Sequence, residues 1–331
     1  MILLFLLSLL VSGCSHVPSS AKEISRSGFF FDTLIDITIY GTDDKSLLDD
    51  SFDLCRKYEN LLSMTVYSSD IARINSAGTN PVHISQETMD LLDAAIEYNK
   101  LSDGRLDIAI GNLSSIWTQS RNDGHLPDSE LIRDALPHAG LDKITVDKDM
   151  MCVYKSDPET ALDLGSLGKG YVADRLKEML VSRGVTSAII SLGGNIVTIG
   201  KKPDGRAFHI GIKKPFSQDN EVAEEVSVWD KSVVTSGVYE RYLSVDNRIY
   251  HHVLDPKTGY PADTDLMSAT IICDSSLEAD ALSTICLIYG LDDAMQLINK
   301  TSGAEAVFIT WDNQLHYTGG ASFYINTNPL L

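Results

Sequence analysis

The chain has 331 residues, of which 44% are hydrophobic and 22% are charged, a composition typical of one large globular domain or two intimate ones. It carries 27 basic and 46 acidic residues, which gives a formal net charge of -19. This charge excludes general binding to nucleic-acid backbones and argues against adsorption to anionic lipid, unless a local basic patch intervenes.

The N-terminus has the features of a lipoprotein signal. Residues 1–10 form an almost unbroken apolar run, too short for a membrane-spanning helix, that leads into Val11-Ser-Gly-Cys14. This segment is similar to a bacterial lipobox, whose cysteine is lipidated and becomes the mature N-terminus. We therefore predict a signal peptide over residues 1–14, a flexible tether over 15–28 and a folded domain over 29–331. No Lys or Arg precedes the apolar run, so a start codon assigned too late or an uncleaved apolar tail remain alternatives.

The first half of the folded region is predicted to mix strands and helices. Alternating apolar residues predict a strand over 29–40, and apolar residues at helical spacing predict helices over 45–62 and 85–102, the second capped by Ser85. The further elements that we expect are apolar strands over 106–111 and 161–164, a surface loop over 118–129, a helix over 131–139, a hairpin of 144–146 with 150–154, and a helix over 172–180.

The second half is predicted to be richer in strands. These are expected over 188–191, 196–199, 208–212, 222–229, 232–235, 241–245, 269–272, 306–310 and 315–317, with helices over 277–289 and 292–298. Runs of strands with interspersed helices favour an α+β fold over a regular βαβ array. The cysteines are Cys14, Cys55, Cys152, Cys273 and Cys286. No pair is spaced as C-x-x-C, so beyond Cys14 we expect buried free thiols rather than a disulfide framework or a zinc site.

The most informative stretch is Ala161-Leu-Asp-Leu-Gly-Ser-Leu-Gly-Lys-Gly-Tyr171, in which an apolar segment enters a glycine-rich turn and then a helix. Three glycines allow close approach of a ligand, and Lys169 adds positive charge at a helix start, where free N–H groups favour anions. The spacing matches neither a P-loop nor a dinucleotide fingerprint. A phosphate site and a purely structural strand-to-helix turn are both consistent with it.

Three further segments combine groups that could act in catalysis. Asp107 interrupts an apolar strand, where a carboxylate either binds something or lies at an exposed edge. His252 is followed by Asp255 at a polar turn, which resembles a base with an orienting carboxylate, although adjacent histidines can be plain surface residues. Asp280 and Thr284 are four residues apart on one helical face beside Ser283, a hard-oxygen set suited to magnesium or an ordinary i to i+4 hydrogen bond.

Taken in order, these segments resemble the ApbE family, the FAD:protein FMN transferases, over residues 31–290. The matching pieces are Ser69-Asp-Ile-Ala-Arg-Ile-Asn75, Asp103-Gly-Arg-Leu-Asp-Ile-Ala-Ile-Gly111 with Trp117, Leu162-Asp-Leu-Gly-Ser-Leu-Gly-Lys-Gly-Tyr171 with Asp174, Leu192-Gly-Gly-Asn195, Thr235-Ser-Gly-Val-Tyr-Glu-Arg241, His252-Val-Leu-Asp-Pro-Lys-Thr-Gly259 and Ala279-Asp-Ala-Leu-Ser-Thr284. The resemblance implies a single large domain of two intimate lobes, with mixed T-fold-like sheets and packed helices.

The resemblance also implies an activity, in which FAD is split with the help of Mg2+, FMN is moved onto a Thr hydroxyl of a partner protein, and AMP is released. It assigns catalysis to His252, as the base, and to Asp280. It assigns the metal to Ser166, Asp280, Ser283 and Thr284. It assigns the FAD site to Phe31, Thr65, Arg105, Leu106, Asp107, Asp163, Lys169, Ser236, Tyr239, Arg241, His252, Leu254, Asp255 and Thr258.

Two positions depart from the family pattern, since Thr65 stands where many relatives have an aromatic residue near the flavin, and Phe31-Asp32-Thr33 replaces Met-Gly-Thr. Met267-Ser-Ala-Thr270 shares part of the acceptor signature Ser/Thr-Gly-Ala-Thr, but it lies in a predicted strand and is interpreted as structural. The implied acceptors are redox-pump subunits or extracytoplasmic flavoproteins, which suits a lipid anchor on the outer face of the bacterial membrane. The alternatives are an FAD pyrophosphatase that gives free FMN and AMP, and a non-catalytic FAD-binding lipoprotein.

Overall fold

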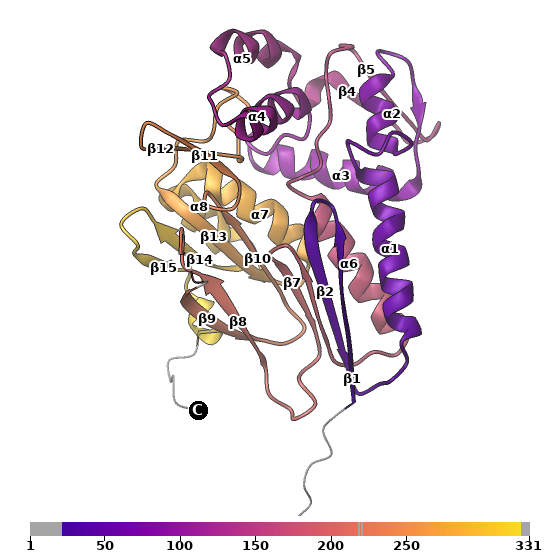
Figure 1. Ribbon diagram of the computed structural model, residues 1–331, viewed down its shortest axis with the longest axis vertical. Helices are drawn as coiled ribbons and strands as arrows, with labels where there is room; N and C mark the ends of the chain where they lie inside the picture. Colours follow the sequence, from indigo (N-terminus) through magenta and orange to yellow (C-terminus); the bar gives the residue numbers. More distant parts are fainter. Residues whose placement is uncertain (1–21, 218, 220, 326–331) are drawn as a thin grey trace, which may run out of the picture.

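The computed structural model describes residues 22–325 except 218 and 220, and its centre is an eight-stranded sheet (Figure 1). Every neighbouring pair of strands is antiparallel. In spatial order the strands are β1 (Glu23–Phe30), β2 (Thr33–Tyr40), β6 (Ala188–Leu192), β7 (Asn195–Ile199), β10 (Ser232–Gly237), β13 (Leu266–Cys273), β14 (Glu305–Thr310) and β15 (Leu315–Tyr317).

Helices and three small sheets surround this sheet. The helices are α1 (Ser46–Leu62), α2 (Asp70–Ser76), α3 (Gln86–Leu101), α4 (Gly111–Asp123), α5 (Ser129–Ala135), α6 (Gly168–Ser182), α7 (Ser276–Tyr289) and α8 (Leu291–Lys300), with short 3-10 turns at Leu136–His138, Leu141–Lys143 and Ala321–Phe323. The small sheets pair β3 (Val82–His83) and β4 (Ile144–Asp147) with β5 (Cys152–Lys155), β8 (Phe208–Lys213) with β9 (Val222–Val228), and β11 (Tyr242–Val245) with β12 (Arg248–His251). The predicted α+β class is confirmed.

Two large cores account for the two predicted lobes. The first packs α1 and α6 against β1, β2 and β6, and the alternation in β2 leaves Ile35, Ile37 and Ile39 with 0% exposure. The second packs α7, α8 and the β8–β9 hairpin against β10, β13 and β14, so every residue of β13 is buried. A third, small core joins α4 and α5 to Leu254 and Tyr250, at the end of the molecule where β11 and β12 lie (Figure 1).

The structure corrects three predictions of element bounds. Strand β1 begins at Glu23 and pairs along its whole length with β2, so the folded domain begins before residue 29 and the predicted tether is too long. The single strand predicted over 29–40 is broken by a turn at Phe31 and Asp32, with φ of 53° and 56°. Residues 118–123 continue α4, which ends at Gly124 with φ of 76°. The remaining part of the tether prediction and the signal peptide fall outside the described residues.

The two apolar runs at 106–110 and 161–164 are not strands. They lie against each other, with Asp163 N–H donating to the Ile108 carbonyl at 2.7 Å and Gly111 N–H to the Ala161 carbonyl at 2.8 Å. The Asn75 side chain forms hydrogen bonds with both the N–H and the carbonyl of Leu162. These are the bonds that a neighbouring strand would otherwise form. The spacing of apolar residues does not show when a side chain forms the hydrogen bonds of a backbone segment. The strand prediction was wrong for this reason.

The four cysteines among the described residues, Cys55, Cys152, Cys273 and Cys286, are buried free thiols, as expected. Burial raises the pKa of Cys55 and of Cys273 to about 12. Among the described residues, no helix combines the length and apolar character needed to cross a bilayer.

We predict that Gly170→Ala weakens the packing of α6 on α7. A Cβ at Gly170 would lie 2.7 Å from Asp280 Cβ and 2.8 Å from Leu277 Cα, so the helices must move apart. The free energy of unfolding, measured by urea titration, should fall by about 1–3 kcal/mol. Gly168→Ala in the same helix is the control, because its Cβ would meet Leu164 Cβ at an ordinary 3.9 Å. Equal stability of the two variants would contradict this account.

Candidate functional site

The site is centred on the crossing of α6 and α7. Gly170 N–H of α6 donates to Asp280 Oδ2 of α7 at 2.9 Å, and Lys169 Nζ lies 3.9 Å from Asp280 Oδ1. Asp174 fixes the start of α7 by accepting from Ser275 Oγ at 2.7 Å and from two backbone N–H groups of that turn. The crossing therefore positions one carboxylate with its two oxygens in different surroundings.

Asp280 is almost completely enclosed, with 3% exposure. Burial raises the pKa of Asp280 above its ordinary value, while the Lys169 charge and the Gly170 N–H oppose that rise. The Asn195 side chain also favours the charged carboxylate. A buried carboxylate with incomplete compensation is suited to bind a cation.

Three hydroxyl groups lie together on α7 and the neighbouring strand β10, on the stretch of α7 that follows Asp280. Ser236 Oγ of β10 lies 2.8 Å from Ser283 Oγ and 3.4 Å from Thr284 Oγ1, and Ser283 Oγ donates to the Asp280 carbonyl at 3.0 Å. Across the part of the chain that the structure describes, no group of three or more His, Cys, Asp or Glu side chains is arranged to hold a metal. One carboxylate with hydroxyls fits Mg2+ rather than a softer metal, since Mg2+ keeps waters and takes substrate phosphate oxygens as ligands.

The glycine turn is held rigidly beside this donor set. Asp163 Oδ1 accepts from Gly165 N–H at 2.9 Å, and Lys169 Nζ donates to the Gly165 carbonyl at 3.2 Å, while Ser166 is partly exposed on the turn. The expected free N–H groups of the α6 N-terminus are partly used, since Gly168 donates to the Leu164 carbonyl and Gly170 to Asp280. The Lys169 ammonium is therefore the group of the turn that we predict to bind an anion.

The His252 turn is a compact unit held from two sides. Within it, the Asp255 carbonyl accepts from the N–H of Thr258 at 3.1 Å and of Gly259 at 2.9 Å. From outside, Arg105 Nη1 binds Asp255 Oδ2 at 3.1 Å, and Trp117 Nε1 of α4 donates to the Gly259 carbonyl at 2.8 Å. Asp255 therefore anchors the turn to Arg105, and the predicted orienting contact with His252 is not formed.

His252 lies close to the positive charges of the site. Burial lowers the pKa of His252 to about 3, and the charges of Arg241 and Lys169 contribute to the shift. The Nδ1 atom of His252 is buried and has no hydrogen-bond partner. The imidazole is therefore neutral at neutral pH, and its Nδ1 has no partner within the described residues.

Several predicted FAD-site residues have structural roles. Asp107 accepts from Ala109 N–H at 2.7 Å and from Leu141 N–H at 3.0 Å, and burial raises its pKa. It therefore caps backbone groups rather than lying at an exposed edge, and its role in the FAD site stays a prediction. Leu106 and Leu254 are core residues, 1% and 3% exposed.

The remaining predicted residues lie around the same end of the sheet. Phe31 N–H, at the tip of the β1–β2 hairpin, donates to Glu59 Oε1 at 2.8 Å. The Gly193 turn is pressed against that hairpin, since a Cβ there would lie 2.8 Å from Thr33 Cβ. Of the others, Thr65 and Arg241 are exposed, Thr258 is exposed on its turn, and Tyr239 is buried against Gly237.

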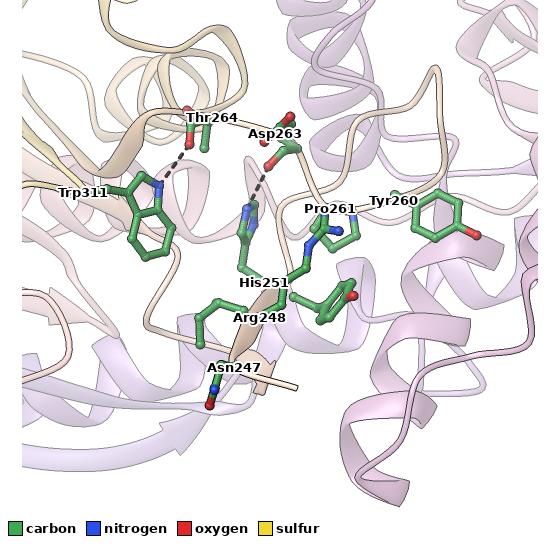
Figure 2. A pocket seen from close by; sticks show the side chains of 11 residues that line it. Asn247, Arg248, His251, Tyr260, Pro261, Asp263, Thr264 and Trp311 are labelled. Carbon is green, nitrogen blue, oxygen red and sulfur yellow. Dashed lines mark hydrogen bonds between the residues drawn. The ribbon is translucent and has the colours of Figure 1, made fainter. Parts of the chain in front are cut away.

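A cavity of about 330 Å³ lies next to this site rather than in it (Figure 2). Its lining consists of residues 247–251, residues 260–264 and Trp311. It contains none of the predicted metal or FAD residues, although His251 in its wall precedes His252 in the chain.

Comparisons with known proteins identify the family. The model of the ApbE family matches residues 31–308. The chain belongs to the ApbE family. It is 32% identical over 293 residues to the FAD:protein FMN transferase of Klebsiella pneumoniae, covering 88% of this chain and 90% of that protein, and 31% identical over 317 residues to that of Treponema pallidum, covering 90% and 88%. The solved ApbE protein of Thermotoga maritima has a TM-score of 0.84 at 28% identity, covering 92% of this chain and 99% of that one. The flavin transferase ApbE of Vibrio cholerae has a TM-score of 0.82 at 25% identity, with the same coverage.

Membership in the ApbE family confirms the resemblance and the fold class, whereas the roles of individual residues stay predictions. No functional signal in the sequence marks four residues that contact the segments of this site: Glu59, Asn75, Trp117 and Asn195. Three of them, Asn75, Trp117 and Asn195, belong to the segments that resemble the family, but no function was predicted for them. Their contacts join residues far apart in the chain, such as Trp117 and Gly259, so no spacing rule could find them.

We predict that the buried histidines make this ApbE protein less stable as pH falls. Burial lowers the pKa of His251 to about 4, below its value of about 6.5 in the unfolded chain. Below pH 6.5 the unfolded state therefore binds a proton that the folded state excludes, so stability present at pH 7 is lost towards pH 5. Urea unfolding should show that wild type loses about 1–2 kcal/mol more than His251→Gln over this interval. Parallel pH profiles for the two proteins would disprove it.

Proposed function

We propose that this chain is a magnesium-dependent FAD:protein FMN transferase, which moves FMN from FAD onto a threonine hydroxyl of a partner protein and releases AMP. The observation that carries the proposal is the meeting of Asp280, the Ser283 and Thr284 hydroxyls and the Lys169 glycine turn at one helix crossing. A cation site beside a lysine suits a pyrophosphate, which a chain of net charge -19 would otherwise repel. Family relatives bear the same name, FAD:protein FMN transferase.

In this proposal, substrate binding, metal binding and proton transfer are carried out by different side chains. Lys169 would bind pyrophosphate oxygens, and Asp280, Ser283, Thr284 and an oxygen of Ser166 would hold Mg2+, whose charge, when bound, stabilises the negative charge that grows as AMP leaves. The threonine oxygen bonds to the phosphorus of the FMN half, the bond from that phosphorus to the AMP oxygen breaks, and His252 takes the hydroxyl proton. A bound pyrophosphate offsets the positive charges that lower the pKa of His252, so substrate binding makes it a better base.

We also propose that lipid on Cys14 anchors the protein to the extracytoplasmic face of a bacterial membrane. The support is the apolar run that ends in Val11-Ser-Gly-Cys14. An anchored domain there would meet acceptors of the predicted kind, redox-pump subunits or extracytoplasmic flavoproteins. Labelling of the whole protein, but not of Cys14→Ser, by a fatty-acid probe in cells would support the anchor.

The first test measures AMP and FMN release from FAD, with Mg2+ or EDTA, and with or without an acceptor bearing the Ser-Gly-Ala-Thr signature. We expect AMP release that requires Mg2+ and FMN that stays on the acceptor through denaturing gel electrophoresis. Free FMN despite a competent acceptor would instead establish an FAD pyrophosphatase. Tight FAD binding without AMP release under any condition would establish a non-catalytic flavin carrier.

We predict that Asp280→Asn abolishes turnover while the fold survives. The amide has the same shape and can accept from Gly170 N–H, but it lacks the charge needed for a cation. The rate of AMP release should fall by at least about 100-fold. Glu278→Gln is the matched control, since burial also raises the pKa of this carboxyl on α7. Unchanged AMP release from Asp280→Asn would remove Asp280 from the metal site.

A further inference from the structure

The cavity beside the site has an unusual lining. It is bordered by five consecutive residues on one side, 247–251, and by five on the other, 260–264, with Trp311 at one end (Figure 2). The face of a strand presents only every second residue, so five in a row indicate that the cavity runs along the strand's edge. We call this cavity the β12 slot.

The hairpin geometry identifies which backbone groups face the β12 slot. Strands β11 and β12 are joined by Asp246 and Asn247, with φ of 50° and 61°, a two-residue turn of the type that closes hairpins. The flanking pair Val245 and Arg248 is then hydrogen bonded, and the pairs alternate along the ladder. The N–H and C=O groups of Ile249 and of His251 consequently point away from β11.

Within the described part of the chain, no backbone hydrogen bond joins residues 248–251 to any segment other than β11. The same edge is paired only further along, where Ala262 N–H donates to the Val253 carbonyl at 3.0 Å. His251 adds an unsatisfied acceptor. Its Nε2 contacts the Ala262 carbonyl at 3.0 Å and must donate there, which leaves the buried Nδ1 with a lone pair and no partner. Donors and acceptors of one strand edge are thus unpaired beside a cavity.

The spacing of these groups fits an extended polypeptide. Alternate residues of a strand are about 6.6 Å apart, which is the repeat with which another strand's backbone groups recur. Peptide binding by strand addition uses such an edge, with side-chain specificity left to neighbouring pockets. The exposed rings of Tyr260 and Trp311, 39% and 44% exposed, border the slot and can contact the side chains of an added strand.

We propose that the β12 slot binds the acceptor protein as an added β-strand, which delivers its threonine to His252. The slot extends along β12 to His251, and His252, the proposed base, is the next residue in the chain. This inference rests on the proposed transferase function, and it assigns acceptor recognition to backbone groups outside the FAD and metal residues. Recognition of backbone explains how one enzyme can serve several acceptors that share a short signature.

The test removes one outward N–H. Ile249→Pro lacks this donor, and proline is tolerated where a strand's N–H faces away from its partner. With a synthetic peptide centred on Ser-Gly-Ala-Thr, its KM for FMN transfer should rise about tenfold, the effect of losing one backbone hydrogen bond with its acceptor left unpaired. FAD affinity, measured by flavin fluorescence, should stay as in wild type.

Two matched variants isolate the edge effect. Ser244→Pro changes the equivalent outward N–H on the opposite edge of the hairpin, and Ile249→Ala removes the side chain but keeps the N–H. Both should retain the wild-type KM for peptide. A KM for Ile249→Pro equal to that of Ser244→Pro would overturn the proposal.

A second measurement needs no variant. Hydrogen exchange of the wild-type protein with FAD bound should slow at the amides of Ile249 and His251 when the peptide is added, and not at Ser244. Unchanged exchange at Ile249 and His251, with transfer to the peptide intact, would overturn the slot while the transferase function stands. Absence of transfer by wild type to any acceptor, with peptide protection at β12, would instead count against the transferase function alone.

Discussion

Helices α6 and α7 cross where Gly170 has no side chain, and this close approach lets the Asp280 carboxylate accept the Gly170 N–H at 2.9 Å. The same approach brings Lys169 within 3.9 Å of the other carboxylate oxygen. The Gly170 N–H and the Lys169 charge offset part of the free-energy cost of burying the Asp280 carboxylate. The part that is not offset favours the binding of a further positive charge. The hydroxyls of β10 and α7 are placed by this crossing.

The second half of the site depends on long-range anchoring. The His252 turn carries its own hydrogen bonds, but its position comes from Arg105 on one side and Trp117 on the other, more than 100 residues earlier in the chain. Trp117 stacks on Tyr250 with ring centroids 5.9 Å apart, so the α4–α5 unit holds the turn and the β11–β12 hairpin together. Movement of that unit would shift the base and the β12 slot as one body.

Much of the fold was predictable, because its strands and helices follow ordinary periodicity: the alternation in β2 and the helical spacing in α1 and α3 need no tertiary information. The glycine turn and the Asp280 face could be proposed as site segments from the sequence, since their chemistry lies within short segments, and their roles stay predictions. The two apolar segments that were wrongly predicted as strands share one cause. The Asn75 side chain pairs with the backbone of Leu162, and the Asp107 side chain caps the backbone of Leu141, so polar side chains satisfy backbone groups where the local pattern predicts neighbouring strands.

The low reactivity of the buried cysteines matters in the extracytoplasmic compartment that we propose for this protein. A thiol reacts with oxidants and disulfides through its thiolate, and burial raises the pKa of Cys55 and Cys273 to about 12, so almost none is ionised at neutral pH. Such thiols are slow to form mixed disulfides even where the surroundings are oxidising. The four described cysteines are free and buried, so their thiols contribute to stability by packing in the interior, where their surroundings also protect them from oxidants.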